Sequence, residues 1–159
     1  MPSFEDFVEA YNHSESVFEE YSESVQSFVN IFLIKFGSYL GCPVRMLTER
    51  HKLFFNENGE MRFEFAVPVS PKGRIPEKLV KFDAVAYRRK EKSHINITGV
   101  KREFVFDIRD PETNGSMFDD QELNEAYNFI SGEILDFIRH AYDYDNPISQ
   151  KIGFNLVAK

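Results

Sequence analysis

The chain has 159 residues, of which 42% are hydrophobic and 28% charged, and a net charge of −7. This composition is typical of a globular protein rather than a disordered one, and the length fits one ordinary domain over residues 1–159. The most apolar run, residues 28–40, is shorter than the roughly 20 residues of a membrane-spanning helix, so we expect no membrane association. Cys42 is the single cysteine and no signal peptide is recognisable, which favours a cytoplasmic location.

The first predicted element is a long helix over residues 4–40. Apolar residues recur every seven positions, at Phe4, Tyr11, Phe18, Val25, Phe32 and Tyr39. This spacing is typical of one helical face. Ser3 with Asp6 forms a typical N-terminal cap, and Gly41 is a typical stop signal. A helix of this length would be about 55 Å long, so either it breaks or bends near residues 12–14, which we favour, or one end projects.

Residues 44–109 are predicted to form an antiparallel sheet. Apolar and polar residues alternate over residues 61–69, as in a half-buried strand. Residues 79–89 and 94–109 are predicted to form a second hairpin, in which the apolar residues before Gly99 share one face. The apolar residues after Gly99 would then lie on the opposite face, so we expect a bulge near Gly99 or a sheet covered on both sides.

A second helix is predicted over residues 119–143, capped by Asp119. Its buried stripe is predicted to contain Leu123, Tyr127, Ile130, Ile134, Phe137, Ile138 and Ala141. Alternating apolar residues in the tail, residues 147–159, indicate one more short strand. The order α-β-β-β-β-α predicts an α+β fold, in which a mostly antiparallel sheet of four to five strands packs against the N-terminal and C-terminal helices.

Charge is divided along the chain into three segments. Residues 1–40 contain seven acids and one base, residues 41–105 fourteen bases and eight acids, and residues 106–159 eleven acids and four bases. These boundaries coincide with those of the predicted elements. We therefore expect acidic helices around a basic sheet.

Four glutamates, Glu15, Glu19, Glu20 and Glu23, lie on the predicted polar side of the first helix. Neighbouring acids on a helix repel each other by a few tenths of a kcal/mol per pair, and lysine or arginine would have been equally soluble. We interpret these residues as a surface for a basic protein partner, and predict a non-enzymatic binding module of inhibitor, immunity or adaptor type. Solubility alone is the alternative explanation. The seven-residue repeat also allows a homodimer through this helix.

The second interpretation is a nucleic-acid or phosphate binder. Arg88, Arg89, Lys90 and Lys92 crowd one predicted hairpin tip beside Tyr87. Such cations can neutralise phosphates, and a tyrosine ring can stack on a base. Against this, charged hairpin tips are usually solvated, and acidic helices would repel a polyanion.

The remaining chemical signals are sparse. Asp110, Glu112 and Asn114 match the first oxygen ligands of a calcium loop, but Gln121 stands where a bidentate glutamate is needed. A polar turn leading into a capped helix is the alternative for this loop. The histidines lack metal-ligand spacing, and we find no catalytic or cofactor motif, so we predict no cofactor. A small-ligand enzyme, with an aromatic pocket between the sheet and the first helix, is the third interpretation.

Overall fold

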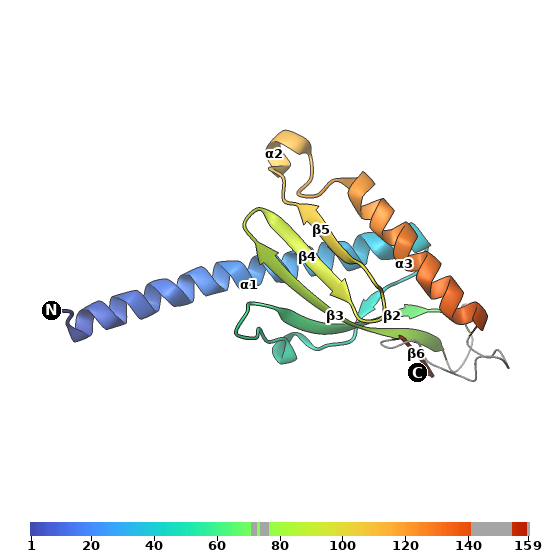
Figure 1. The fold of residues 1–159 in the computed structure, drawn as a ribbon, viewed down its shortest axis with the longest axis horizontal. Coiled ribbons are helices and arrows are strands. Elements are labelled where there is room, and N and C mark those ends of the chain that lie inside the picture. Colours follow the sequence, from blue (N-terminus) through green and yellow to red (C-terminus); the bar gives the residue numbers. More distant parts are fainter. Residues whose placement is uncertain (71–72, 74–76, 141–153, 159) are drawn as a thin grey trace.

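The computed structural model describes residues 1–70, 73, 77–140 and 154–158, and it has the predicted α+β arrangement (Figure 1). The helices are α1 (Phe4–Leu40), α2 (Pro111–Asn114) and α3 (Asp120–His140), with a 3-10 turn η1 (Arg50–Lys52). The strands are β1 (Arg45–Met46), β2 (Met61–Pro68), β3 (Lys78–Arg89), β4 (Lys92–Ile97), β5 (Glu103–Asp107) and β6 (Phe154–Ala158).

α1 is one continuous helix of 37 residues, so the break favoured near residues 12–14 is wrong. That segment, Asn-His-Ser, interrupts the apolar stripe but contains neither Gly nor Pro, and a change of polarity alone does not break a helix. Residues 4–20 are all exposed and extend beyond the sheet, with the N-terminus at the far end (Figure 1). The excess length of the helix therefore projects from the body, which was the second of the two arrangements expected from the sequence. We call residues 4–20 the arm.

Both ends of α1 are closed as the sequence predicts. The Asp6 carboxylate accepts a hydrogen bond from the Ser3 backbone N–H (2.7 Å), and the Ser3 hydroxyl accepts one from the Asp6 N–H (3.3 Å). At the other end, Gly41 adopts a left-handed conformation (φ 73°), and its N–H donates to the Gly37 carbonyl. These caps satisfy backbone groups that the helix itself leaves unpaired.

The strands that the structure describes form one antiparallel sheet in the order β1-β2-β3-β4-β5, with β6 paired to β3. β3 is the central strand: β2 covers one of its edges, whereas β4 and β6 share the other. β6 confirms that the tail contains an extra strand, and with it the sheet has six strands rather than four or five.

The second hairpin differs from the prediction after Gly99. The predicted facing of β3 and β4 is confirmed, since Ala86 lies opposite Ile95. Residues 94–109 are not one strand, however, because the chain reverses around Gly99 (φ 93°) to form β5. The reversal places Phe104 opposite Ile95, on the same face of the sheet. Neither a bulge nor a second covering layer is needed to bury the later apolar residues.

The core lies where α1 and α3 meet the inward face of the sheet. Phe32, Phe36 and Tyr127 are almost fully buried, and the Phe36 and Tyr127 rings stack with centroids 4.9 Å apart. The Tyr127 hydroxyl donates to the Phe32 carbonyl at 2.7 Å, which satisfies the buried polar group.

One residue of the stripe predicted for α3 does not join the core. Ile138 is 39% exposed, because it follows the buried Phe137 by one position and therefore points about 100° away around the helix. Ala141 and the predicted helix end at 143 lie outside the described residues.

Candidate functional site

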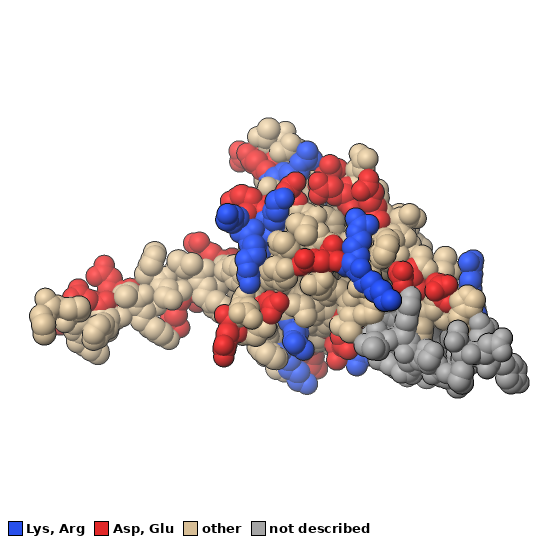
Figure 2. Space-filling view, in the orientation of Figure 1, with Lys and Arg blue, Asp and Glu red and all other residues tan. Residues whose placement is uncertain are grey.

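The arm contains every acid of the first charge segment except Glu23. Glu15, Glu19 and Glu20 are fully exposed on it, and residues 1–34 include no lysine or arginine. In Figure 2 the arm accordingly shows acidic and uncharged surface only. The structure thus brings these three predicted residues onto one helix segment that makes no use of them for its own packing.

Aromatic side chains form an exposed stripe along the same arm. Phe4, Phe7, Tyr11 and Phe18 are 75%, 65%, 62% and 51% exposed. They continue, at helical spacing, the stripe that is buried against the sheet farther along α1. We call these four side chains the aromatic face. Sequence reasoning placed them on one helical face without deciding whether that face is covered, and the signal for their exposure was the excess length of the helix.

Most of the acids project from the side of the arm opposite the aromatic face. Glu9 and Tyr11 are two positions apart, as are Phe18 and Glu20, and two positions turn an α-helix by about 200°. Glu15 borders the aromatic face instead, where its carboxylate accepts a hydrogen bond from the Tyr11 hydroxyl (2.9 Å). This hydrogen bond raises the pKa of Tyr11. The arm therefore has an aromatic face and, pointing in another direction, a surface of acids that we call the acidic face. The acidic face includes Glu9, Glu19 and Glu20.

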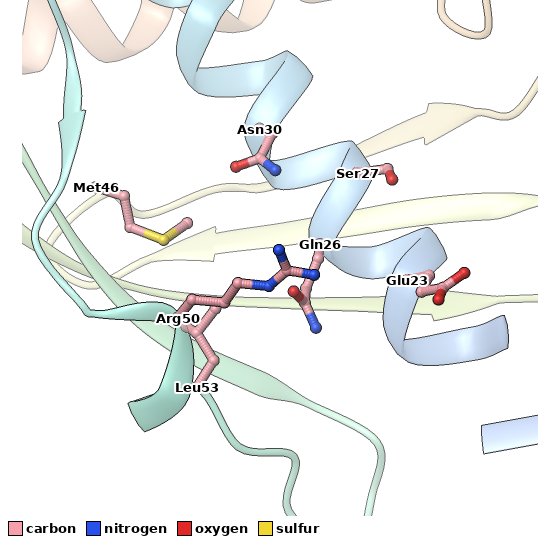
Figure 3. Close-up of a pocket in the computed structure, with 7 residues that line it drawn as sticks. All are labelled: Glu23, Gln26, Ser27, Asn30, Met46, Arg50 and Leu53. Atoms are coloured by element: carbon pink, nitrogen blue, oxygen red, sulfur yellow. The ribbon is translucent and has the colours of Figure 1, made fainter. Parts of the chain in front are cut away.

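A groove of about 300 Å³ opens where the arm joins the body (Figure 3). It lies between α1 and the segment that leads from β1 through η1, and it is lined by Glu23, Gln26, Ser27, Asn30, Met46, Arg50 and Leu53. The Arg50 side chain points toward Gln26, whereas Glu23 lies farther along α1 (Figure 3). Glu23 therefore lies apart from the other three glutamates, beside a groove whose lining includes the cationic side chain of Arg50.

The cations of the predicted anion-binding hairpin tip contact other groups of the same protein. Arg88 donates to the Ser24 hydroxyl of α1 (2.8 Å) and lies 3.7 Å from the Glu91 carboxylate. Lys92 lies 3.5 Å from the Asp107 carboxylate.

Arg89 is engaged in the same way. Its guanidinium lies over the Tyr87 ring, 4.8 Å from the centroid, and donates to the Asn58 carbonyl. Lys90 occupies the turn with a left-handed backbone (φ 57°) and is exposed. Three of the four predicted cations are therefore engaged by other groups of the protein, Arg88 by α1, Arg89 by the Asn58 carbonyl and Lys92 by Asp107 of β5, which leaves less charge for a phosphate ligand.

A cluster that sequence reasoning missed lies on the outward face of the sheet. The Tyr87 and His94 rings stack with centroids 4.5 Å apart, and the Tyr87 hydroxyl donates to the Glu103 carboxylate. His94 Nδ1 lies 3.3 Å from the same carboxylate. The hydrogen bond to Glu103 raises the pKa of Tyr87 to about 12, so the phenol keeps its proton to a higher pH than an ordinary tyrosine. The cluster ties β3, β4 and β5 together, and only strand pairing reveals it.

Charges on the body are interleaved rather than separated. The expected basic sheet is interrupted by acids, as in the pairs Lys81–Glu64 (2.9 Å) and Arg45–Glu77 (2.9 Å), and basic and acidic groups alternate across the face seen in Figure 2. At the end of α1, Lys35 pairs with Asp120 of α3 (2.5 Å). The expectation of two electrostatic zones is therefore wrong for the body and holds for the arm alone.

The candidate calcium loop folds as a short capped turn. One Asp110 carboxylate oxygen accepts from the Glu112 N–H (3.0 Å) and the other from the Thr113 hydroxyl (3.1 Å). The Asn114 side chain donates to the Asp110 backbone carbonyl (3.2 Å). Within the described residues, no group of three or more His, Cys, Asp or Glu side chains is placed to hold a metal ion. These contacts favour the polar turn over the calcium loop.

The region between the sheet and α1, expected to hold an aromatic pocket in the third interpretation, is filled by rings. Phe28, Phe32 and Phe36 are at most 2% exposed, and Phe28 and Phe32 each contact Phe106 of β5 with ring centroids 5.8 and 6.0 Å apart. A substrate could enter there only by displacing the core.

Comparison with known proteins adds no assignment. No family model, no curated protein and no solved structure matches the chain. Within the residues that the structure describes, no helix has both the length and the apolar character that crossing a bilayer requires.

Proposed function

We propose that this chain is a protein-binding module whose arm docks on a basic surface of another protein. The observation that carries the proposal is the arm itself: residues 4–20 are all exposed, include six acids and no lysine or arginine, and extend away from the body. The arm meets the body at its base, where the Phe18 ring lies against Phe55 with centroids 5.5 Å apart. A helix segment with so few tertiary contacts is only marginally stable in water. The retention of such a capped extension of α1 is accounted for if a second molecule uses it.

The spacing of the acids supports a partner more than it supports solubility. Glu15, Glu19 and Glu23 follow one another at four-residue intervals, as do Glu5 and Glu9. Each such pair of like charges destabilises a helix by about 0.2–0.5 kcal/mol. Lysines at alternate positions would have kept the arm soluble and removed this cost, whereas a basic partner removes it by neutralising the acids.

Among the described residues, none of the ion pairs joins an acid of the arm to a base of the body. Several cations of the body are instead paired with its own acids, as Lys81 is with Glu64 and Arg45 with Glu77, which weakens their attraction for the arm. A partner held by the arm could be occluded, as by an inhibitor or immunity protein, or tethered, as by an adaptor. Attraction of this kind acts over about 8 Å at physiological salt and weakens as salt rises.

The test compares charge-reversed variants of equal net charge. The full chain is immobilised and used to capture proteins from a native lysate, and a captured protein is then purified and its binding measured directly. Glu15→Lys/Glu19→Lys/Glu20→Lys should lose this binding. The control Glu57→Lys/Glu112→Lys/Glu125→Lys alters three exposed acids of the body and should retain it.

Two results would overturn the proposal. Equal binding by the wild type and the arm variant would remove the arm as the docking surface. Equal loss in both variants would show a general effect of net charge rather than a site. Binding that is unaffected by about 0.5 M salt would likewise contradict an electrostatic interface.

A further inference from the structure

We propose that two copies of this chain associate through the aromatic faces of their arms, packed antiparallel. The side chains involved are Phe4, Phe7, Tyr11 and Phe18, which are all more than half exposed. Phe18, at the base of the arm, also makes an edge contact with Phe55 of its own body, with ring centroids 5.5 Å apart. Farther along α1, the same stripe is buried by the sheet, as at Phe32. One continuous apolar face is therefore covered over one half of the helix and uncovered over the other half.

The distribution of charge permits this association. Most acids of the arm project away from the aromatic face, as Glu9 does relative to Tyr11, so two aromatic faces can meet while the acids point outward into solvent. Of the four positions that flank the stripe, Val8, Ala10 and Val17 are uncharged, and the fourth, Glu15, accepts a hydrogen bond from Tyr11 of the stripe itself. In paired helices these flanking positions decide whether charge opposes association. The like charge of two arms therefore does not prevent pairing, although it would prevent acidic faces from meeting.

The sizes of the side chains favour the antiparallel orientation. In a parallel pair each position meets its own equivalent, so Tyr11 would crowd Tyr11 while Ser14 faced Ser14 across a gap. Antiparallel packing instead places Tyr11 of one copy against Ser14 of the other, and Phe7 against Phe18. Pairing large residues with small ones across an interface fills it without voids or overpacking. In the same register, Phe4 reaches the base of the other arm.

The apolar area is sufficient for a weak dimer. An aromatic side chain contributes about 200 Å² when fully accessible, so four that are 51–75% exposed offer about 500 Å² on each arm. Two arms together would bury about 1,000 Å², the lower limit for a specific interface. We therefore expect a dimer that forms at high concentration and dissociates on dilution.

An anionic membrane is a poorer occupant of this face, because interfacial helices carry cations on their polar side to meet anionic lipids. The arm carries acids there. A second copy requires no charge of opposite sign, only a matching apolar stripe. The dimer would leave both acidic faces outward, so it is compatible with the proposed function but does not depend on it.

Sedimentation equilibrium of the full chain over a range of concentrations tests the association. The wild type should show a monomer–dimer equilibrium, and Phe7→Ala/Phe18→Ala should raise the dissociation constant at least tenfold. The control Ile34→Ala/Phe54→Ala removes two side chains of the body that are 69% and 63% exposed and should leave the constant unchanged. Circular dichroism of each variant verifies that the helix is retained.

Orientation is tested by a cysteine near the tip. In a Cys42→Ser background, Pro2→Cys should not cross-link under mild oxidation, because antiparallel pairing places the two tips more than 30 Å apart along the arms. Rapid disulfide formation between tips would contradict the antiparallel arrangement.

The remaining outcomes are also decisive. A wild-type chain that stays monomeric at millimolar concentration, or a dimer unaffected by Phe7→Ala/Phe18→Ala, would overturn the proposal. A monomer that instead binds vesicles of anionic lipid through the same two rings would assign the face to membranes. Glu19→Lys/Glu20→Lys should leave the dimer intact, which separates this inference from the acidic docking surface.

Discussion

Replacement of Gly37 by alanine should destabilise the protein, although alanine is the better helix former. A methyl group at Gly37 would lie 2.8 Å from the Cys42 carbonyl oxygen and 3.3 Å from the Val44 nitrogen. Both are backbone atoms, so they cannot move aside by rotating a side chain. In an open helix interior, Gly→Ala stabilises by about 0.5–1 kcal/mol, but overpacking a close contact costs about 1–3 kcal/mol. We expect a net loss of about 1 kcal/mol.

The second helix provides the matched control. Gly132 lies within α3, is exposed, and has no atom within 4 Å of an added methyl group. Gly132→Ala should therefore stabilise the protein by about 0.5–1 kcal/mol. Urea denaturation of the full chain, followed by far-ultraviolet circular dichroism, measures both free energies of unfolding. If Gly37→Ala stabilises as much as Gly132→Ala, the turn after α1 does not pack against the helix as described.

Three further changes test the core, the sheet and the arm. Tyr127→Phe removes the buried hydrogen bond to Phe32 and should lower the free energy of unfolding by about 1 kcal/mol; an unchanged urea midpoint would contradict that contact. The pKa of Tyr87 is raised to about 12 by Glu103, above its value of about 10 in the unfolded chain. The folded state therefore retains a proton that the unfolded state loses, and stability should fall between about pH 10 and pH 12. Tyr87→Phe should reduce that fall in urea midpoints measured against pH. Ser3→Ala removes the cap and should cost the arm about 1 kcal/mol of local helix stability, seen as lower helicity with no shift in the urea midpoint. A shifted midpoint would mean that the arm is coupled to the body beyond the contact of Phe18 with Phe55.

Local patterns predicted most of the elements correctly. The capping pair Ser3 and Asp6, the alternation over residues 61–69 and the extra strand in the tail all depend on neighbours in the chain, and the structure contains each of them. The reversal at Gly99 was missed because a glycine between two apolar runs fits a bulge and a turn equally well.

The candidate site could be predicted only in part. The exposure of Glu15, Glu19 and Glu20 follows from their helical positions. The exposure of Phe4 does not, because a stripe at seven-residue spacing is the same whether a sheet covers it, as it covers Phe32, or nothing does. Spacing specifies a face, and only the reach of the sheet determines which part of that face is buried.

The basic hairpin was misjudged for a related reason. Arg88 is held by Ser24, which lies 64 positions earlier in the chain. Such a partner is invisible to any local pattern, as are the contacts of Arg89 with Asn58 and of Lys92 with Asp107. The cluster of cations in the sequence therefore suggested more positive charge for a ligand than the folded protein leaves available.

Amide hydrogen exchange tests most directly whether the arm is free of its own body apart from the contact of Phe18 with Phe55 at its base. At a concentration low enough to prevent association, amides of residues 4–20 should exchange within the range of a fraying helix, while those of residues 25–36, packed on the sheet, should exchange orders of magnitude more slowly. Adding the captured partner, or raising the protein concentration, should slow exchange in the arm alone. Equal protection of both segments in dilute solution would show that the arm is folded back onto the body. That result would contradict the proposal that the arm is an exposed docking surface.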